Sequence, residues 1–327
     1  MKNVSDSSAQ IVDWATTDAP LEGGGLCAAI GNFDGVHKGH QAVIETAVAA
    51  AHADGLTPAI ITFDPHPREF FRQDDAPFHL ADRVEKDRLL SGLDVARIIH
   101  VTFDDNLRRT DAESFVTSVL PKLGVRRLMA GADFAFGKGR GGDIDTINAM
   151  GAAVGISAQP IPLLLDANSV VISSSRIRAA LQAGEPEQAA EMLGHDWAIT
   201  GIVQQGDQRG RTIGFPTANI PLGALQHPAF GVYAVQIFEE MDGALPLLLG
   251  NGVANIGIRP TVENRGVLCE AHLFDESMDV YGRRLSIRLK SFLRAEQKFN
   301  GIEALTAQIA KDASDARAVL PSIKATA

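Results

Sequence analysis

The sequence contains few cysteines, no long apolar run and a deficit of basic residues. Only two cysteines, Cys27 and Cys269, occur among 327 residues, which excludes a disulfide framework and favours a reducing compartment. We expect both thiols to be small, buried apolar groups. No stretch approaches about 18 uninterrupted apolar residues, and residues 1–19 lack the basic and apolar regions of a secretory signal. The sequence therefore predicts a cytoplasmic location and no membrane span.

The charge balance limits the classes of partner. The chain has 30 Lys and Arg against 40 Asp and Glu, a formal net charge of −10. Such a chain has no general electrostatic attraction to nucleic acid or to anionic lipid, so binding of either is disfavoured. Any anionic ligand must be held by local groups. At roughly 150 residues per domain, the length predicts two domains, each large enough to bury a core.

The first half of the chain alternates short apolar runs with helical patterns. Apolar runs predict buried strands at 26–30, 58–63, 96–101, 126–130 and 156–161. Helices are predicted at 39–53, from a capping box formed by Thr110 and Glu113, at 174–183 and at 186–193. The helix at 39–53 has one apolar face, made of Val43, Ile44, Ala47, Val48 and Ala51. This alternation predicts an α/β, Rossmann-like domain with a doubly wound parallel sheet.

The second half changes to a period of two after Gly194. Strands are predicted at 199–203, 231–237, 267–273 and 285–289, which indicates an antiparallel sheet or barrel. A last helix, from about residue 301, has Ile302, Leu305 and Ile309 on one face. We therefore expect a loose N-terminal extension at 1–22, an α/β domain at 23–188 and a β domain at 189–320.

The string GNFDGVHKGH, residues 31–40, follows the first predicted strand and opens the first predicted helix. Anions bind at the carboxyl ends of parallel strands and at helix N-termini. His37 and His40 are three residues apart and share one side of the first turn, with Gly39 leaving space between them. Two surface histidines at a helix start are the plainer alternative. The spacing favours nucleotidylyl transfer, in which a nucleotide α-phosphate is joined to a second substrate.

Three further strings support a nucleotide site in this half. ISSSRIR, residues 172–178, starts a helix with three hydroxyls and two arginines, a set that suits a triphosphate or pyrophosphate. TFDPHPREFF (62–71) and GADFAFG (131–137) place prolines and aromatic rings just after predicted strands, where they could sandwich a flat ring. The alternatives are a serine-rich helix cap with solvated arginines, and ordinary turn and core residues.

A second group of candidate site residues lies in the β domain. Glycines recur every four residues just before the string PTAN (216–219), and their N–H groups could cover phosphates. Thr217 could ligate Mg²⁺, and Asn219 could add a ligand or a hydrogen bond. Glu270 lies in a predicted strand and shares a face with Leu268 and His272, so it is a candidate general base. A long barrel loop and a solvated strand face are the alternatives.

In their order and spacing these motifs resemble the bifunctional bacterial riboflavin kinase/FAD synthetase family, over about residues 25–318. The strings GVYAV, GVANIGIRPT and LRAEQKF complete the match. The resemblance implies an N-terminal FMN adenylyltransferase domain and a C-terminal riboflavin kinase domain, a six-stranded β-barrel. It implies ATP, riboflavin, FMN and FAD as substrates and products, with Mg²⁺ as cofactor. A non-catalytic flavin carrier or regulator is the alternative, but storage does not need two phosphate-handling sites.

The resemblance also implies a role for individual residues. In the adenylyltransferase domain it assigns ATP handling to Gly31, Phe33, Asp34, His37, Gly39, His40, Ser173, Ser174, Arg176 and Arg178, with His37, His40 and Arg176 catalytic. It assigns the flavin there to Pro65, Pro67, Phe71, Asp133 and Phe136. In the kinase domain it assigns ATP to Gly206, Gly210 and Gly214, Mg²⁺ to Thr217 and Asn219, catalysis to Glu270, and the flavin to Arg294, Glu296 and Phe299. Ser175 stands where Thr is usual, and some relatives have Asn at position 133.

Overall fold

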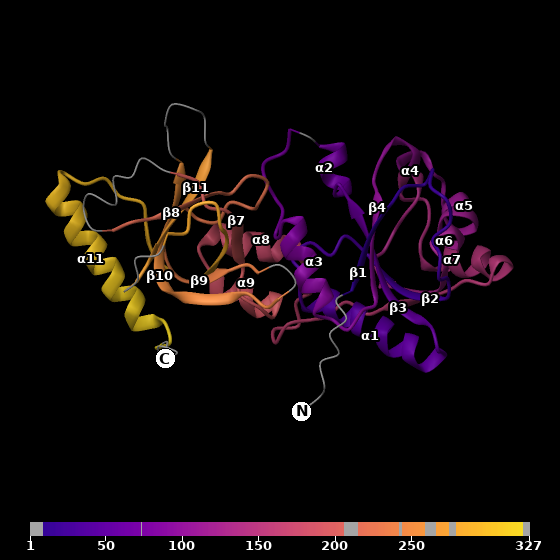
Figure 1. Ribbon diagram of the computed structural model, residues 1–327. Helices are drawn as coiled ribbons and strands as arrows, with labels where there is room; N and C mark the ends of the chain where they lie inside the picture. Colours follow the sequence, from indigo (N-terminus) through magenta and orange to yellow (C-terminus); the bar gives the residue numbers. More distant parts are fainter. Residues whose placement is uncertain are drawn as a thin grey trace. The chain divides into compact units, whose positions relative to one another are not determined.

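The structure is a computed structural model that describes residues 9–72, 74–205, 215–241, 244–258, 266–274 and 279–322 (Figure 1). The chain divides into two compact units. The first comprises Met1–Ala76 and Arg83–Ile172, and the second comprises Pro77–Asp82 and Ser173–Ala327. The predicted domain limit at residue 188 falls inside a helix, α9 (Pro186–Leu193).

The first unit is built on a six-stranded sheet in the order β1-β4-β3-β2-β5-β6. All neighbouring strands are parallel. The strands are β1 (Gln10–Trp14), β2 (Leu26–Ile30), β3 (Thr57–Asp64), β4 (Arg97–Thr102), β5 (Val125–Gly131) and β6 (Ser157–Ile161). The five predicted strands and the predicted parallel sheet are confirmed.

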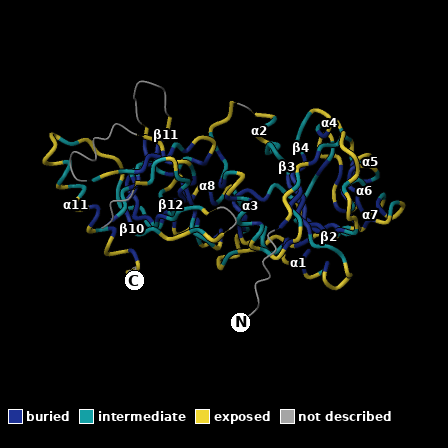
Figure 2. Tube along the Cα trace, viewed as in Figure 1, coloured by how far each residue is buried: buried dark blue, intermediate teal, exposed yellow. Residues whose placement is uncertain are grey.

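Helices cover both faces of this sheet. On one face lie α1 (Lys38–Asp54) and α3 (Arg83–Ser91), and α1 buries the five apolar residues that its sequence predicts. The other face packs against α4 (Asp105–Arg109), a π-helical turn (Phe115–Val119), α6 (Leu120–Lys122) and α7 (Ile144–Gly151). The short α2 (Pro67–Phe71) follows β3. With helices on both faces, the central strands are buried (Figure 2).

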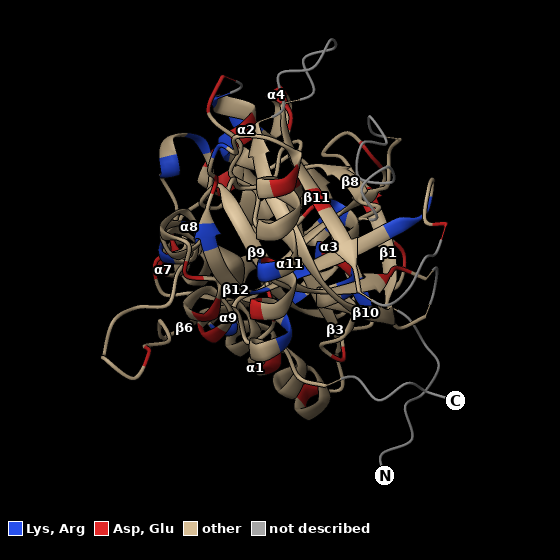
Figure 3. Cartoon of the chain, turned by 90° about the vertical axis from the view of Figure 1, so that its left-hand side faces the viewer, with Lys and Arg blue, Asp and Glu red and all other residues tan. Residues whose placement is uncertain are grey.

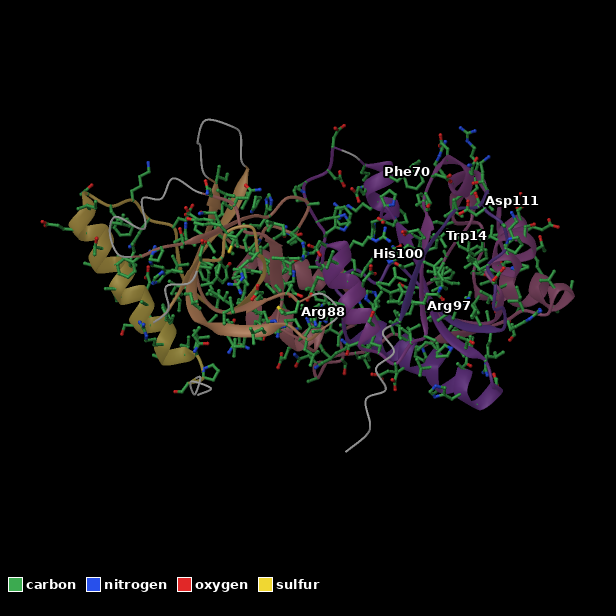
Figure 4. All side chains as sticks on the ribbon, viewed as in Figure 1. Trp14, Phe70, Arg88, Arg97, His100 and Asp111 are labelled. Carbon is green, nitrogen blue, oxygen red and sulfur yellow. The ribbon has the colours of Figure 1, made fainter. Side chains whose placement is uncertain are left out.

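The expectation of a loose N-terminal extension is wrong for residues 10–14. They form β1, which pairs in parallel with β4 at the edge of the sheet. Trp14 of β1 and His100 of β4 are labelled in Figure 4. Trp14 is buried in the core, and its indole N–H donates to the carbonyl of Ala19 at 3.0 Å. The pattern missed this strand because Ile11 and Asp13 are exposed, so that no buried run appears. Residues 1–8 lie outside the described residues.

The predicted capping box is also wrong. The hydroxyl of Thr110 donates to the carbonyl of Asn106, and Thr110 ends α4. The next helix, α5 (Ala112–Ser114), is capped by Asp111, whose carboxylate accepts from the N–H of Ser114 at 2.7 Å. That hydrogen bond lowers the pKa of Asp111. The cap therefore falls one residue later than the pattern predicts, on an equally good capping side chain.

The second unit contains a six-stranded sheet in the order β7-β12-β9-β10-β11-β8, with all neighbours antiparallel. A bridge between Gln204, just after β7, and Asn219 in β8 nearly closes it into the predicted barrel. The strands are β7 (Ala198–Ile202), β8 (Ala218–Pro221), β9 (Gly231–Glu239), β10 (Leu247–Ile258), β11 (Val267–Leu273) and β12 (Arg284–Ala295). Helices α8 (Ser174–Ala183) and α9 have the predicted bounds. Neither β8 nor β10 was predicted.

The predicted terminal helix is confirmed as α11 (Ile302–Val319), which lies along the outside of the barrel against β9, β10 and β12 (Figure 1). Its buried side is formed by later turns than predicted. Ile302 is 64% exposed, whereas Ala313 and Ala316 pack on Val232 and Val253. Acidic and basic residues are interspersed along α11 and the neighbouring strands (Figure 3).

Residues 77–82, which in sequence lie between α2 and α3, are part of the second unit. His79 forms a parallel bridge with Leu225, and its carbonyl accepts from the N–H of Gln226 at 2.7 Å. The carbonyl of Phe78 accepts from Nε of Arg178 at 2.7 Å. We call residues 77–82 the strap, because they run from the first unit into the second and back.

Candidate active sites

The loop between β2 and α1 is a tight turn with an unusual backbone. Phe33, Gly35 and Val36 have φ angles of 50°, 79° and 42°. Positive φ is rare for a β-branched residue such as Val36, and such strain persists only where the surroundings enforce it. Both Phe33 and Val36 are buried in the core. The loop is therefore held rigidly at the carboxyl edge of the sheet.

The two predicted histidines lie against each other at the start of α1. His37 is the N-cap, and its Nδ1 accepts a hydrogen bond from the backbone N–H of His40 at 3.2 Å. The rings stack with centroids 3.5 Å apart and planes 16° apart. A nitrogen that accepts carries no proton, so a neutral His37 ring carries its proton on Nε2. That N–H is a donor of the kind that a phosphate oxygen requires.

Gly39 makes this stacking possible. A Cβ at position 39 would lie 3.1 Å from Cε1 and 3.2 Å from Nδ1 of His37, closer than side chains normally pack. It would also lie 3.7 Å from the carbonyl oxygen of Ile172, the last residue of the first unit. Any larger side chain at 39 would move the ring of His37.

The predicted serine and arginine cluster opens the second unit. Ser173 is the N-cap of α8, and its Oγ accepts from the N–H of Arg176 at 3.4 Å. Arg178 is engaged by the strap, because its guanidinium donates to the carbonyl of Phe78 and lies 5.4 Å from the centre of that ring. The helix starts where the sequence predicts, the serine cap belongs to the plainer alternative for this segment, and Arg178 also has a structural contact.

The flavin-binding residues predicted in the first unit do not share one environment, because some are exposed and one is buried in the core. The Asp64–Pro65 peptide bond is cis, Pro67 starts α2, and Asp133 is exposed. Phe71 is 59% exposed and packs edge-on against Phe103, with ring centres 5.7 Å apart. Phe136 is only 7% exposed and packs in the core against Phe115. No ring contact in the described part of the chain joins Phe71 to Phe136.

The sequence did not single out Lys86, a charged residue of α3 near the same edge of the sheet. Burial lowers the pKa of its ammonium group, while the carboxylates of Asp64, Asp87 and Asp34 act in the opposite direction. The preceding turn of α3 carries Arg83, which donates to Asp64 at 2.7 Å. The sequence gives no sign that Lys86 is buried, because a lysine in a charged helix usually faces solvent.

In the second unit, strand register brings distant residues into one row. Glu270 in β11 lies opposite Asn219 in β8 on one side and Asn255 in β10 on the other. The row continues through Val232 in β9 to Arg294 in β12. Residues directly opposite in antiparallel strands point to the same face. The predicted Asn219, Glu270 and Arg294 therefore share a face with Asn255, which the sequence did not predict.

The predicted flavin residues of this unit lie close to that row. Arg294 donates from Nε and Nη2 to the two carboxylate oxygens of Asp312 in α11, at 2.9 and 2.7 Å. Its guanidinium carbon lies 5.7 Å from the centre of the Phe299 ring. Glu296 accepts from Nδ2 of Asn255 at 3.4 Å. The buried Asp312 thereby fixes the end of the row to α11.

An apolar pocket opens beside Thr217. It has about 520 Å³ of empty space including its mouth, and Ile237, Leu273, Tyr281 and Leu285 contribute to its walls. The carbonyl of Pro216 lies 2.8 Å from Nδ1 of His272, which ties the start of β8 to β11. Its lining residues Ala271 and Leu273 alternate along β11 with Glu270 and His272, so the pocket lies on the face of the sheet opposite the row of Glu270. The predicted phosphate-covering residues Gly206, Gly210 and Gly214 lie outside the described residues.

Comparison with known sequences matches both halves of the chain. The family described as FAD synthetase matches residues 21–176, and the family described as riboflavin kinase matches residues 193–320. The bifunctional riboflavin kinase/FMN adenylyltransferase of Escherichia coli is 40% identical over 302 residues, covering 92% of this chain and 94% of that one. The protein of the same description from Bacillus subtilis is 39% identical over 294 residues, covering 88% and 90%.

The chain belongs to the bifunctional riboflavin kinase/FMN adenylyltransferase family. It phosphorylates riboflavin to FMN and adenylylates FMN to FAD, with ATP as co-substrate in both reactions. The resemblance that the motifs indicated is thus confirmed. The predicted partners riboflavin, FMN, FAD and ATP follow from the two activities.

A solved structure supports the fold. The protein described as a macrolide-efflux protein from Streptococcus pneumoniae superposes with a TM-score of 0.80 at 26% identity, covering 94% of this chain and 99% of that one. Among the described residues of the present chain, no helix is both long enough and apolar enough to cross a membrane.

Proposed function

We propose that the two reactions of the family occur at two separate sites, FMN adenylylation in a domain spanning residues 23–188 and riboflavin phosphorylation in a domain spanning 189–320. The stacked histidines at the start of α1 support the first assignment. The row from Asn219 to Arg294 across the barrel supports the second. We further propose the cytoplasm as the compartment, since both steps consume ATP and both cysteines are free thiols.

In the kinase reaction Glu270 orients the 5′-hydroxyl of riboflavin and accepts its proton. The hydroxyl oxygen bonds to the γ-phosphorus of ATP, the bond from that phosphorus to the bridging oxygen breaks, and ADP leaves. Phosphoryl transfer has a loose transition state, so alignment and charge neutralisation matter more than the strength of the base. Glu270 is half-buried at the middle of the row, where it is held by strands on both sides.

Thr217 and Asn219 would hold Mg²⁺ in this site. A hydroxyl and an amide oxygen are hard oxygen donors of the kind that Mg²⁺ prefers, and Asn219 is buried opposite Glu270. The described residues contain no group of three His, Cys, Asp or Glu that could hold a metal ion. Mg²⁺ commonly keeps few protein ligands and takes phosphate oxygens for the rest, where it neutralises charge on the phosphates.

In the adenylyltransferase reaction a phosphate oxygen of FMN attacks the α-phosphorus of ATP. A new P–O bond forms, the bond from the α-phosphorus to the bridging oxygen breaks, and pyrophosphate leaves. The nucleophile is already anionic, so no general base is needed. His37 and His40 would donate hydrogen bonds to the phosphates, and fixing the two reactants can supply roughly 7–11 kcal/mol of the barrier.

Some residue roles rest on the sequence alone. These are the ATP contacts of Gly31, Phe33, Asp34, Ser173, Ser174, Arg176 and Arg178, and the flavin contacts of Pro65, Pro67, Phe71, Asp133 and Phe136. The observation that supports the proposal best is the shared face of Asn219, Glu270 and Arg294, which come from three strands of the barrel. Incubation of the whole chain with riboflavin, ATP and Mg²⁺ should give FMN and then FAD by chromatography. A flavin carrier would give neither product.

A further inference from the structure

Asp312 is an acidic residue on the side of α11 that packs against the barrel. It is 3% exposed, and the other buried residues of this helix, Ala313 and Ala316, belong to an apolar cluster with Val232 and Val253. Taking a carboxylate out of water is costly, so a buried one persists only where charged or polar groups satisfy it. An apolar side chain would cover the barrel without that cost. Packing alone therefore does not explain an aspartate at this position.

Three hydrogen bonds from side chains satisfy this carboxylate. Nε and Nη2 of Arg294 donate to its two oxygens at 2.9 and 2.7 Å, and Nε2 of Gln308, one helical turn earlier, donates to Oδ1 at 2.7 Å. A bidentate pair of this kind fixes a guanidinium in both position and plane. Nη1 of Arg294 donates to the carbonyl of Ala295 at 3.0 Å. Every nitrogen of the guanidinium is thus engaged, and the group is held in one orientation.

The ion pair closes the connection between the last barrel strand and the terminal helix. Arg294 lies at the end of β12, and Asp312 follows 18 residues later in α11. The intervening chain carries Glu296 and Phe299, the other two residues to which the resemblance assigns the flavin in this domain. The guanidinium carbon of Arg294 lies 5.7 Å from the centre of the Phe299 ring. One buried carboxylate therefore holds both ends of the segment that carries the predicted flavin contacts.

Strand register relates this ion pair to the reacting end of the site. Arg294 lies opposite Val232, and the row leads from there through Asn255 to Glu270. Residues directly opposite in antiparallel strands share a face, so Arg294 and Glu270 lie on the same face of the sheet. Three strand spacings separate them, about 14 Å along the sheet. A tricyclic ring with a five-carbon chain can bridge that span from Arg294 to the carboxylate that we assign to the hydroxyl.

We propose that Asp312 is a positioning residue of the kinase site, which fixes the guanidinium of Arg294 beside Phe299 so that it receives the flavin ring of riboflavin. This inference rests on the proposed assignment of the flavin to Arg294. A planar guanidinium stacks on aromatic rings, and the flavin offers such a ring. Without Asp312 the side chain of Arg294 regains its rotational freedom, and riboflavin must order it on binding.

The test measures steady-state riboflavin phosphorylation by the full chain carrying Asp312→Asn. KM for riboflavin should rise about tenfold, because a charge-assisted bidentate pair is lost. KM for ATP and kcat should change little, and FAD formation from supplied FMN should be unchanged. A merely structural role predicts another pattern, since partial unfolding reduces the number of active molecules. It would lower the apparent kcat and leave KM for riboflavin in place, which would overturn the inference.

The matched control is Asp196→Asn, which breaks another ion pair of β12. Both carboxylate oxygens of Asp196 lie 2.8 Å from Nζ of Lys290, on the same strand as Arg294. Neither partner of this pair is assigned to the flavin, so the control should keep the wild-type KM for riboflavin. Urea midpoints of the two variants record what each pair contributes to folding. An equal rise of KM in both variants would indicate general loosening of the barrel and would overturn the inference.

Arg294→Ala separates the inference from the proposed function. If that variant keeps the wild-type KM for riboflavin, the proposed assignment of the flavin to Arg294 is itself wrong. If Arg294→Ala raises KM while Asp312→Asn does not, only the inference about Asp312 is overturned. Should Asp312→Asn fail to fold, Asp312→Glu decides, because it keeps the charge but moves the carboxylate by one methylene group. Its KM for riboflavin should rise severalfold, and a wild-type KM would overturn the inference.

Discussion

The indole N–H of Trp197 donates a hydrogen bond of 2.7 Å to the carbonyl oxygen of Leu80, although 117 positions separate the two residues in the chain. Leu80 belongs to the strap, and Trp197 is buried just before the first barrel strand. At the end of the strap, the carboxylate of Asp82 accepts from Oγ1 of Thr200 at 2.9 Å and from Arg284. The barrel unit is therefore completed by a segment encoded between two helices of the other unit.

Replacing Asp82 by alanine should destabilise the barrel unit, because Thr200 and Arg284 lose a shared acceptor. We expect the free energy of unfolding to fall by about 1–2 kcal/mol, because both hydrogen-bond partners are partly exposed and such contacts contribute modestly. The measurement is urea denaturation of the full chain followed by loss of kinase activity, with the midpoint moving to lower urea. Asp82→Asn, which keeps an acceptor oxygen, is the control and should lose less. An unchanged midpoint for Asp82→Ala would contradict the structural role of the strap.

Substitution of Gly39 by alanine should impair FAD formation selectively. The added Cβ would displace the His37 ring by a few tenths of an ångström, and small misplacements of catalytic groups are costly. We expect about a tenfold loss in the rate of FAD formation from FMN, with riboflavin phosphorylation retained. Gly141→Ala, in an exposed loop of the same unit, is the control. Equal loss of both activities in Gly39→Ala would point to misfolding rather than to the histidine pair.

Lys86→Met should stabilise the protein near neutral pH. Burial lowers the pKa of Lys86 in the folded state, so the unfolded chain binds the proton more tightly. The resulting cost is fully present below the folded-state pKa and disappears as pH rises toward the unfolded value. The gain from Lys86→Met in the urea midpoint should therefore be larger at pH ~7 than at pH ~10. Lys138→Met, at an exposed lysine, should show no such trend. A gain that grows with pH would contradict the assignment.

Removal of Mg²⁺ should stop FMN formation, and Thr217→Ala should raise the Mg²⁺ concentration needed for half-maximal kinase activity. The reason is the loss of one oxygen ligand, for which we expect about a tenfold change. Thr217→Ser keeps the hydroxyl and is the control. Titration of kinase activity with Mg²⁺ measures both variants. Identical Mg²⁺ requirements in Thr217→Ala and wild type would remove Thr217 from the metal site.

Periodicity predicted the fold wherever burial follows a regular pattern. The buried face of α1 and the bounds of α8 and α9 could be read from the sequence because local spacing determines them. Strand β10 was not predicted, because Gly250, Gly252 and Asn255 interrupt its alternation of apolar and polar residues. Strand β8 escaped because it has only four residues, Ala218–Pro221, next to a glycine-rich segment.

Candidate site residues could be named from the sequence, but their arrangement in space could not. The motifs pointed to His37, His40 and Glu270, because an imidazole pair and a carboxylate are groups that the two proposed reactions could use. The row that joins Glu270 to Asn219 and Asn255 depends on pairing between strands far apart in sequence, which no local pattern encodes. The contacts of the strap could not be predicted for the same reason, since its partners lie about a hundred residues away in the chain. Long-range register, rather than residue type, is what the structure adds.

The central claim is that one chain holds two independent sites, and a pair of variants assayed with separate substrates tests it most directly. His37→Ala should lower FAD formation from FMN by about 10²–10³-fold, the typical cost of removing one preorganised donor, and leave phosphorylation of riboflavin nearly intact. Glu270→Ala should abolish phosphorylation and leave FAD formation from supplied FMN nearly intact. Equal loss of both activities in either variant would contradict the account.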